Sequence, residues 1–321
     1  MKTWTIAFLV VMLESQGVVV ADEKGDEAAA IPSAGTLTAK SCSLGFLEVI
    51  EGAESGEAVL GVRIAFRAVG DHWEAFGSAA DNEHASGSET HAPKTLNWRV
   101  PSLGGLEFSS EVYQSVQMGD AGIHRITGLQ DTARLVPKED SRFTGWRGGK
   151  GFFPTPVFTC ECHVKSCTTR RGRVTQSDVN RARELMWQAL AVDSDPADRL
   201  PEAEKIYQSV RTKGLTWNRI ARLGEVYRAG QDTWFSLSIS GDLRPDPSIP
   251  AEGTDFDKHW YLVRGKDIYS LGVGLEFISS EDLSSDGSCE QLFWMRGYDT
   301  NGYVLATGKI LRIVESSWSY H

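Results

Sequence analysis

The stretch SLGGLEFSSE at 102–111 decides the fold prediction, because the chain repeats it as SLGVGLEFISSE at 270–281. The second copy contains every residue of the first in the same order and inserts only Val273 and Ile278. After the glycines, apolar and polar residues partly alternate, a pattern typical of a strand with one buried face. The sequence therefore predicts that one β element occurs twice.

The segments on either side of this element repeat in the same order. RAVGDHWEAF at 67–76 aligns with RAGQDTWFSL at 228–237, and LNWRV at 96–100 aligns with KHWYLV at 258–263. The offset between the copies only grows along the chain, as duplication followed by loop insertions would leave it. We therefore predict a mainly β protein, α+β overall, with two tandem homologous antiparallel β-domains joined by a short helical hairpin. Each domain is either a sandwich or a barrel.

Composition sets the expected limits of the parts. Lys2, an apolar run at 6–13 and small residues at 19–21 are typical of a secretory signal peptide. The run is far shorter than the roughly 20 residues that cross a bilayer, so we expect an exported protein without a membrane span. The predicted parts are a signal peptide (1–21), a flexible acidic leader (22–41), a first β-domain with a cysteine-rich end (42–167), a basic linker with the helical hairpin (168–214) and a second β-domain (215–321).

Local signals within these parts are a helix, a hairpin and a basic run. Apolar spacing predicts a helix that starts at Ser177, followed by a second helix over 201–212. The apolar stretches at 291–298 and 303–314 predict a hairpin that turns at Asn301-Gly302, because this pair tolerates positive φ. The run Arg170, Arg171 and Arg173 indicates a solvated linker, with a proteolytic site as the second interpretation.

The cysteines predict disulfides, because export exposes thiols to an oxidising environment. Cys160 and Cys162 are too close in sequence to favour each other, so one of them is expected to pair with Cys167 or Cys42. The odd count leaves one cysteine as a free thiol or as a link to another chain. Residues of zinc-ligand type also gather in this loop, but the spacing is poor for a structural zinc site, and we favour disulfides over a metal. The five cysteines are Cys42, Cys160, Cys162, Cys167 and Cys289, and the weak metal candidates are Cys160, Cys162, His163 and Cys167.

The sequence contains no Gly-x-Ser-x-Gly, His-Glu-x-x-His or phosphate-loop motif. We therefore expect no cofactor, and we favour a non-catalytic protein over an enzyme. The formal net charge of −10 argues against a general nucleic-acid binder, whose footprint would be basic.

The residues shared by the two copies are the candidates for a binding face. Trp and Tyr rings beside carboxylates can stack on sugars or hold an extended peptide, whereas the alternative interpretation places the shared Trp residues in the cores. We predict an exported binding or interaction protein with an unknown ligand or protein partner, a glycan or a peptide being the first candidates. The alternatives are an exported hydrolase with a site between the copies and a purely structural envelope protein. The candidate ligand-binding residues are Trp73, Trp98, Trp234, Trp260, Glu107 and Glu276.

Overall fold

The computed structural model describes residues 42–51, 58–70, 72–76, 95–112, 123–127, 132–143, 151–159, 162, 164–192, 221–239, 258–285, 287–297, 300–308 and 310–319. The predicted signal peptide, the leader and the second helix at 201–212 lie outside these residues, so the helical hairpin stays a prediction beyond its first helix.

Antiparallel strands dominate the described residues, which confirms the mainly β prediction. The first half contains β1 (Ser43–Glu51), β2 (Ala58–Val69), β3 (His72–Ala75), β4 (Thr95–Val100), β5 (Leu106–Val112), β6 (Ile123–Thr127) and β7 (Thr155–Thr159), with the short 3-10 helices η1 (Pro101–Leu103), η2 (Thr132–Leu135) and η3 (Ser141–Phe143). The second half contains β8 (Lys165–Ser166), β9 (Arg170–Arg171), α2 (Gln176–Val192), β10 (Ala221–Ala229), β11 (Asp232–Ile239), β12 (Lys258–Arg264), β13 (Asp267–Val273), β14 (Leu275–Asp282), β15 (Glu290–Gly297), β16 (Thr300–Thr307) and β17 (Arg312–Ser319).

Strands of the first half close into a six-stranded barrel. Their order is β1-β7-β4-β5-β6-β2, and β2 pairs back with β1 to complete the ring. β3 extends the sheet from the other end of β2. The barrel is narrow enough for side chains to fill it, and its core contains Leu47, Val62, Trp98 and Val157. The Trp98 indole N–H donates a 2.6 Å hydrogen bond to the Ser110 hydroxyl inside this core.

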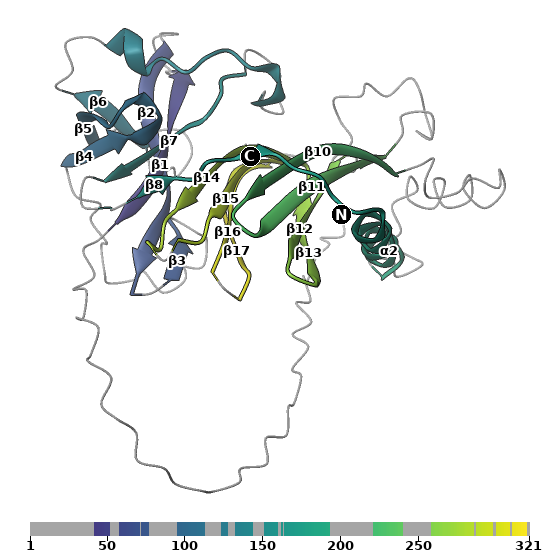
Figure 1. Cartoon of the computed structure of the whole chain (residues 1–321). Coiled ribbons are helices and arrows are strands. Elements are labelled where there is room, and N and C mark those ends of the chain that lie inside the picture. The colour runs from purple at the N-terminus through teal and green to yellow at the C-terminus, as the bar shows by residue number, and fades with distance from the viewer. Residues whose placement is uncertain are drawn as a thin grey trace, which may run out of the picture. The chain divides into compact units, whose positions relative to one another are not determined.

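The strands β10 to β17 form an antiparallel meander that divides into two sheets, drawn in green and yellow in Figure 1. The β10–β13 sheet has the order β13-β12-β11-β10-β9, and the β14–β17 sheet has the order β17-β16-β15-β14-β8. One core contains side chains of both sheets, including Trp234, Trp260, Phe277 and Phe293. A fully buried Trp removes about 150–250 Å² of surface from water, which corresponds to roughly 4–6 kcal/mol of hydrophobic stabilisation.

The barrel and the β14–β17 sheet also share an apolar core, which is separate from the barrel core and from the core of the meander. Phe46 of β1 stacks on Tyr303 of β16 with ring centroids 3.7 Å apart. The Tyr303 hydroxyl hydrogen-bonds the Glu48 carboxylate, and the Arg63 guanidinium lies 3.9 Å above the Trp318 ring. Residues far apart in the sequence are therefore buried together in this core.

The helix α2 covers the other face of the β10–β13 sheet. The Asp178 N–H donates a 3.1 Å hydrogen bond to the Thr175 hydroxyl, so Thr175 caps the helix. α2 therefore begins at Gln176, one residue before the predicted Ser177. Its apolar face packs against the sheet through Val179, Ala182 and Met186, which meet Phe235, Leu237 and Tyr261.

The predicted duplication into two homologous domains is not shown by the fold. Matching hairpins exist in both halves, because β2–β3 and β10–β11 turn at Gly70 and Gly230 with φ of 61° and 56°. The following strands pair differently. β4 pairs with β5, which carries most of the first copy of the repeated stretch. The second copy begins in β13, which pairs with β12, and continues in β14, which pairs with β15. The homology of the two halves remains a prediction.

The predicted hairpin of the second half is confirmed as β15–β16, but the predicted turn is wrong. Gly297 pairs with Thr300 and Arg296 pairs with Asn301, so the chain reverses before Asn301. Gly302 lies inside β16, where a Cβ atom would stand 2.7 Å from the carbonyl oxygen of Ser316. The glycine is required by this close approach of β17 rather than by a turn.

Two disulfides connect distant parts of the chain, Cys42–Cys162 and Cys167–Cys289. The first belongs to the pairings that the sequence favours, and the second was not among them. Cys160 lies outside the described residues, so the expectation of one cysteine left for another chain stays a prediction.

Candidate functional site

The four candidate tryptophans are buried rather than exposed. Trp98 lies in the barrel core, and Trp234 and Trp260 lie in the core of the meander, all with no exposed surface. Trp73 is 8% exposed and belongs to the core shared by the barrel and the β14–β17 sheet. These residues do not form the exposed aromatic face that the binding hypothesis predicts, and a ligand-binding role for them stays a prediction.

The two candidate glutamates have different surroundings. Glu107 in β5 is exposed and pairs with Arg99 of β4, with 2.8 Å between the charged atoms. Glu276 in β14 is half-buried and binds the ammonium group of Lys258 at 2.7 Å. Only Glu276 therefore belongs to a larger charged network.

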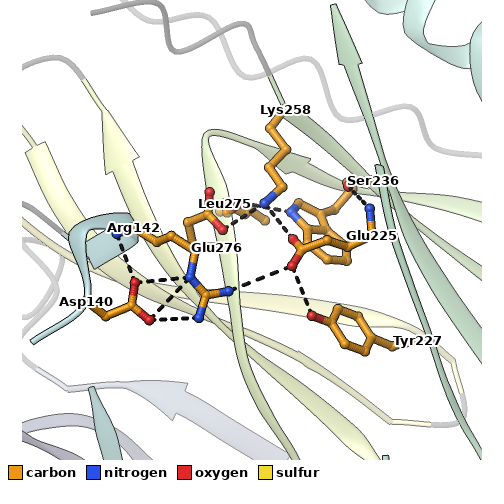
Figure 2. A network of polar contacts seen from close by, with 9 residues as sticks. Asp140, Arg142, Glu225, Tyr227, Ser236, Lys258, Leu275 and Glu276 are labelled. Atoms are coloured by element: carbon orange, nitrogen blue, oxygen red, sulfur yellow. Dashed lines mark hydrogen bonds and ion pairs between the residues drawn. The ribbon is translucent and has the colours of Figure 1, made fainter. Parts of the chain in front are cut away.

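This network centres on Lys258, the first residue of β12 (Figure 2). Its ammonium group contacts the Glu276 carboxylate at 2.7 Å and the Glu225 carboxylate of β10 at 2.6 Å. The same ammonium lies 5.4 Å from the centre of the Trp260 ring, within the range of a cation–π contact. The Trp260 indole N–H donates to the backbone oxygen of Leu275, which holds the ring beside β14.

A second cation approaches the network from the segment between the barrel strands β6 and β7. Arg142 of η3 lies 3.7 Å from Glu225 and binds Asp140 at 2.8 Å. Two backbone bonds with Gly151 and Phe153 hold this segment, since the Asp140 N–H donates to Gly151 and the Phe153 N–H donates to Lys138. The network thus combines residues of η3, β10, β12 and β14.

A local irregularity positions Glu225. The β10–β11 pairing shifts register between Leu223 and Val226, and such bulges redirect side chains. The Glu225 N–H donates a 3.0 Å hydrogen bond to the Ser236 hydroxyl of β11. The Tyr227 hydroxyl then donates to the Glu225 carboxylate at 3.0 Å. Glu225 therefore accepts bonds from Lys258 and Tyr227 together.

The protonation states make Glu225 an acceptor and Tyr227 a donor. Burial raises the pKa of the Glu225 carboxyl, but the hydrogen bond and charge of Lys258, with smaller contributions from Tyr227 and Arg142, bring this pKa below its ordinary value. Burial and the neighbouring Glu225 charge raise the pKa of Tyr227 to about 12. At neutral pH Glu225 is consequently a carboxylate, and the arrangement suits recognition of hydrogen-bond donors rather than proton donation by Glu225.

The network is accessible to solvent. The side chains of Arg142, Glu225, Glu276 and Lys258 are 45%, 32%, 22% and 21% exposed. Together with Asp140, three carboxylates face two cations, so the group carries an excess negative charge. A ligand with ammonium, guanidinium or hydroxyl groups can therefore compete for the carboxylate oxygens.

Among the described residues, no group of three or more His, Cys, Asp or Glu side chains is placed to hold a metal ion. Of the four weak metal candidates, Cys162 and Cys167 are in disulfides, so their sulfurs are not thiolate ligands. Cys160 and His163 lie outside the described residues.

Sequence reasoning found Glu276 but missed Arg142, Glu225, Tyr227 and Lys258. The bulge and the approach of η3 bring these residues together, and neither feature has a clear signal in the sequence. The aligned position in the first copy gave no hint, because Glu107 pairs with a neighbouring strand.

Comparisons with protein families, with curated proteins and with solved structures found no match. None of the helices in the described part of the chain has the length and apolar character needed to span a membrane.

Proposed function

We propose that the chain is an exported, non-catalytic binding protein that contacts its ligand through the Lys258–Glu225–Glu276 network. The observation that carries the proposal is the partly exposed Lys258 side chain, whose ammonium group lies between two carboxylates. Solvent-exposed ion pairs contribute only about 0–1 kcal/mol to stability, so stability alone does not account for this network. It has more carboxylates than cations beside the Tyr227 hydroxyl, which favours a ligand rich in hydrogen-bond donors.

The ligand class that fits is a basic peptide or a glycan. A peptide would present ammonium or guanidinium groups, and a glycan would present several hydroxyl groups. The half-buried Tyr227 ring, which stacks against Trp260 at a centroid distance of 6.1 Å, offers an aromatic contact at the edge of the network. The two disulfides are compatible with export, because such bonds persist in oxidising compartments.

The test compares the purified protein with two matched variants on peptide and glycan arrays. Glu276→Gln removes one carboxylate of the network, and Glu107→Gln removes the aligned carboxylate of β5, which pairs with Arg99 outside the network. We expect Glu276→Gln to weaken the ligands found for the wild type by about 10–100-fold, since hydrogen bonds to charged groups contribute about 1.5–3 kcal/mol. Glu107→Gln should leave them unchanged.

Other outcomes would count against the proposal. Equal losses in both variants would favour two equivalent sites, one in each half. Binding that neither variant affects would place the ligand elsewhere on the chain.

One specific observation favours the alternative that the chain is a structural protein. All four shared tryptophans are buried in cores, as expected if the repeated residues maintain the fold. A chain that binds nothing on either array would favour an exported structural protein.

A further inference from the structure

The segment between the two halves crosses from one sheet of the meander to the other. β8 pairs with β14 at the edge of one sheet, and β9 pairs with β10 at the edge of the other. The Cys167 N–H donates to Ser280, and the Gly172 N–H donates to Val226, both at 3.0 Å. We call residues 165–172 the strap.

Two exposed arginines, Arg170 and Arg171, form β9 near the end of the strap, and the exposed Arg173 follows it directly. Arg170-Arg171 is the only pair of adjacent Lys or Arg residues in the 321-residue sequence. β9 is the last strand of its sheet, so one edge of this extended segment has no strand partner among the described residues. Extended edges of this kind are what peptide-binding clefts recognise by strand addition.

We propose that the peptide bond between Arg173 and Val174 is a processing site for an endoprotease with acidic specificity pockets. Its pockets would take Arg173 directly before the bond and Arg170 and Arg171 further upstream. Hydrolysis adds one water molecule, leaves a carboxylate on Arg173 and leaves an ammonium group on Val174. The product is a molecule of two chains.

The geometry selects this bond over the one after the arginine pair. At Gly172 a Cβ atom would stand 3.1 Å from the Tyr227 carbonyl oxygen, so the Arg171–Gly172 bond lies tightly against β10. Arg173 is exposed and lies between β9 and α2, in neither element. A protease reaches such a connection more readily than a bond packed against a strand.

The disulfides decide what cleavage does to the molecule. Cys42 and Cys162 both precede the bond, whereas Cys167 precedes it and Cys289 follows it. The two chains therefore remain joined through Cys167–Cys289. The proposal does not rest on the ligand-binding network, although Arg171 pairs with Tyr227 of that network in the β9–β10 ladder.

The experiment treats the purified full-length chain, with both disulfides intact, with a serine endoprotease that requires an arginine directly before the cleaved bond and another arginine three residues further upstream, the positions of Arg173 and Arg170. We expect one band of unchanged size on a denaturing gel without reductant and two fragments after reduction. The new N-terminal sequence should be Val-Thr-Gln-Ser. Arg173→Gln should slow cleavage by at least about 100-fold, because the pocket loses its charged partner.

Matched variants separate this bond from its neighbours. Arg171→Gln should retain cleavage after Arg173, and Arg312→Gln, at an exposed arginine of the edge strand β17, should leave the rate unchanged. An intact chain under these conditions would overturn the proposal, as would a fragment that begins at Gly172. Fragments that separate without reductant would overturn the two-chain product.

Discussion

His124 is a buried titratable side chain inside the barrel. It has no exposed surface, and neither ring nitrogen has a hydrogen-bond partner among the described residues. Its cross-strand neighbour Val62 belongs to the apolar core of the barrel. Burial lowers the pKa of His124, because the interior disfavours the charged imidazolium.

The lowered pKa predicts a loss of stability in acid. The unfolded chain binds a proton near the ordinary histidine pKa of about 6.5, whereas the folded chain resists protonation at His124. The free energy of unfolding should therefore fall as the pH drops below about 6.5. His124→Leu should reduce this dependence, as measured by urea unfolding between about pH 7 and about pH 5.

A control in the same strand distinguishes titration from packing. Ile126→Val should lower stability by about 0.5–1.5 kcal/mol at every pH, because it removes one methylene and no titratable group. An unchanged pH dependence in His124→Leu would show that another group is responsible.

Glu281 should change the pH dependence of stability in the direction opposite to that of His124. Its carboxyl is buried, one of its oxygens has no hydrogen-bond partner among the described residues, and burial raises its pKa. The folded chain therefore keeps a proton that the unfolded chain loses above about 4.3. The contribution of Glu281 to stability should fall as the pH rises through its folded pKa. Thermal unfolding should show Glu281→Gln more stable than the wild type at neutral pH, with a smaller difference near about pH 4.

Glu290 provides a contrast on the neighbouring strand. Its carboxylate accepts bonds from the Leu283 N–H and from the hydroxyls of Ser284 and Ser288. Glu290→Gln would direct an amide N–H₂ at these donors and should cost about 1–3 kcal/mol at neutral pH. Equal effects of the two substitutions would contradict the difference in their surroundings.

A substitution at Gly302 tests how tightly the strands β16 and β17 are packed together. A Cβ atom would stand 2.7 Å from the Ser316 oxygen and 3.0 Å from the Met295 methyl group, so Gly302→Ala must displace β17. We expect a loss of about 1–3 kcal/mol in the free energy of unfolding. Ser317→Ala on the exposed face of β17 should change it by less than about 0.5 kcal/mol. A neutral Gly302→Ala would show that the two strands separate easily.

At the level of single strands, composition and apolar–polar alternation predicted the structure better than the expected turn residues did. The stretches rich in β-branched and aromatic residues around the shared tryptophans are strands, and Trp98, Trp234 and Trp260 are buried in them. Asn301-Gly302 looked like a turn but lies in β16, because close strand packing also requires glycine. The strands β8 and β9 have two residues each, too few for any periodicity to appear.

The disulfides act on the whole molecule. They close loops of 120 and 122 residues, for which the chain-entropy estimate is about 5 kcal/mol and measured losses are about 2–5 kcal/mol. Replacing Cys167 and Cys289 by serine should lower the free energy of unfolding by such an amount, as measured by denaturant unfolding. Replacing Cys42 and Cys162 by alanine should have a similar effect, since the loops are nearly equal. A clearly smaller loss in one variant would mean that the unfolded chain is already compact in that loop.

Neither the closure of the barrel nor the charged network could be predicted from the sequence, and the reason is the same for both. The barrel closes only when β7 fits between β1 and β4, and Arg142 reaches the network only because η3 approaches β10. Both are contacts between segments distant in the chain, and local patterns carry no information about them. Glu276 was predicted from the repeat, but its partners Lys258 and Glu225 depend on the meander.

The positions of the cysteines also set an order for folding during synthesis. Cys162 follows β7, the strand that completes the barrel, so its bond with Cys42 can form as soon as the first half has been translated. Cys167 must wait for Cys289, a delay of roughly 6–24 s for 122 residues at about 5–20 residues per second. We expect Cys162 to be bonded to Cys42 before Cys289 is synthesised. Cys289 then cannot form a non-native disulfide with Cys162.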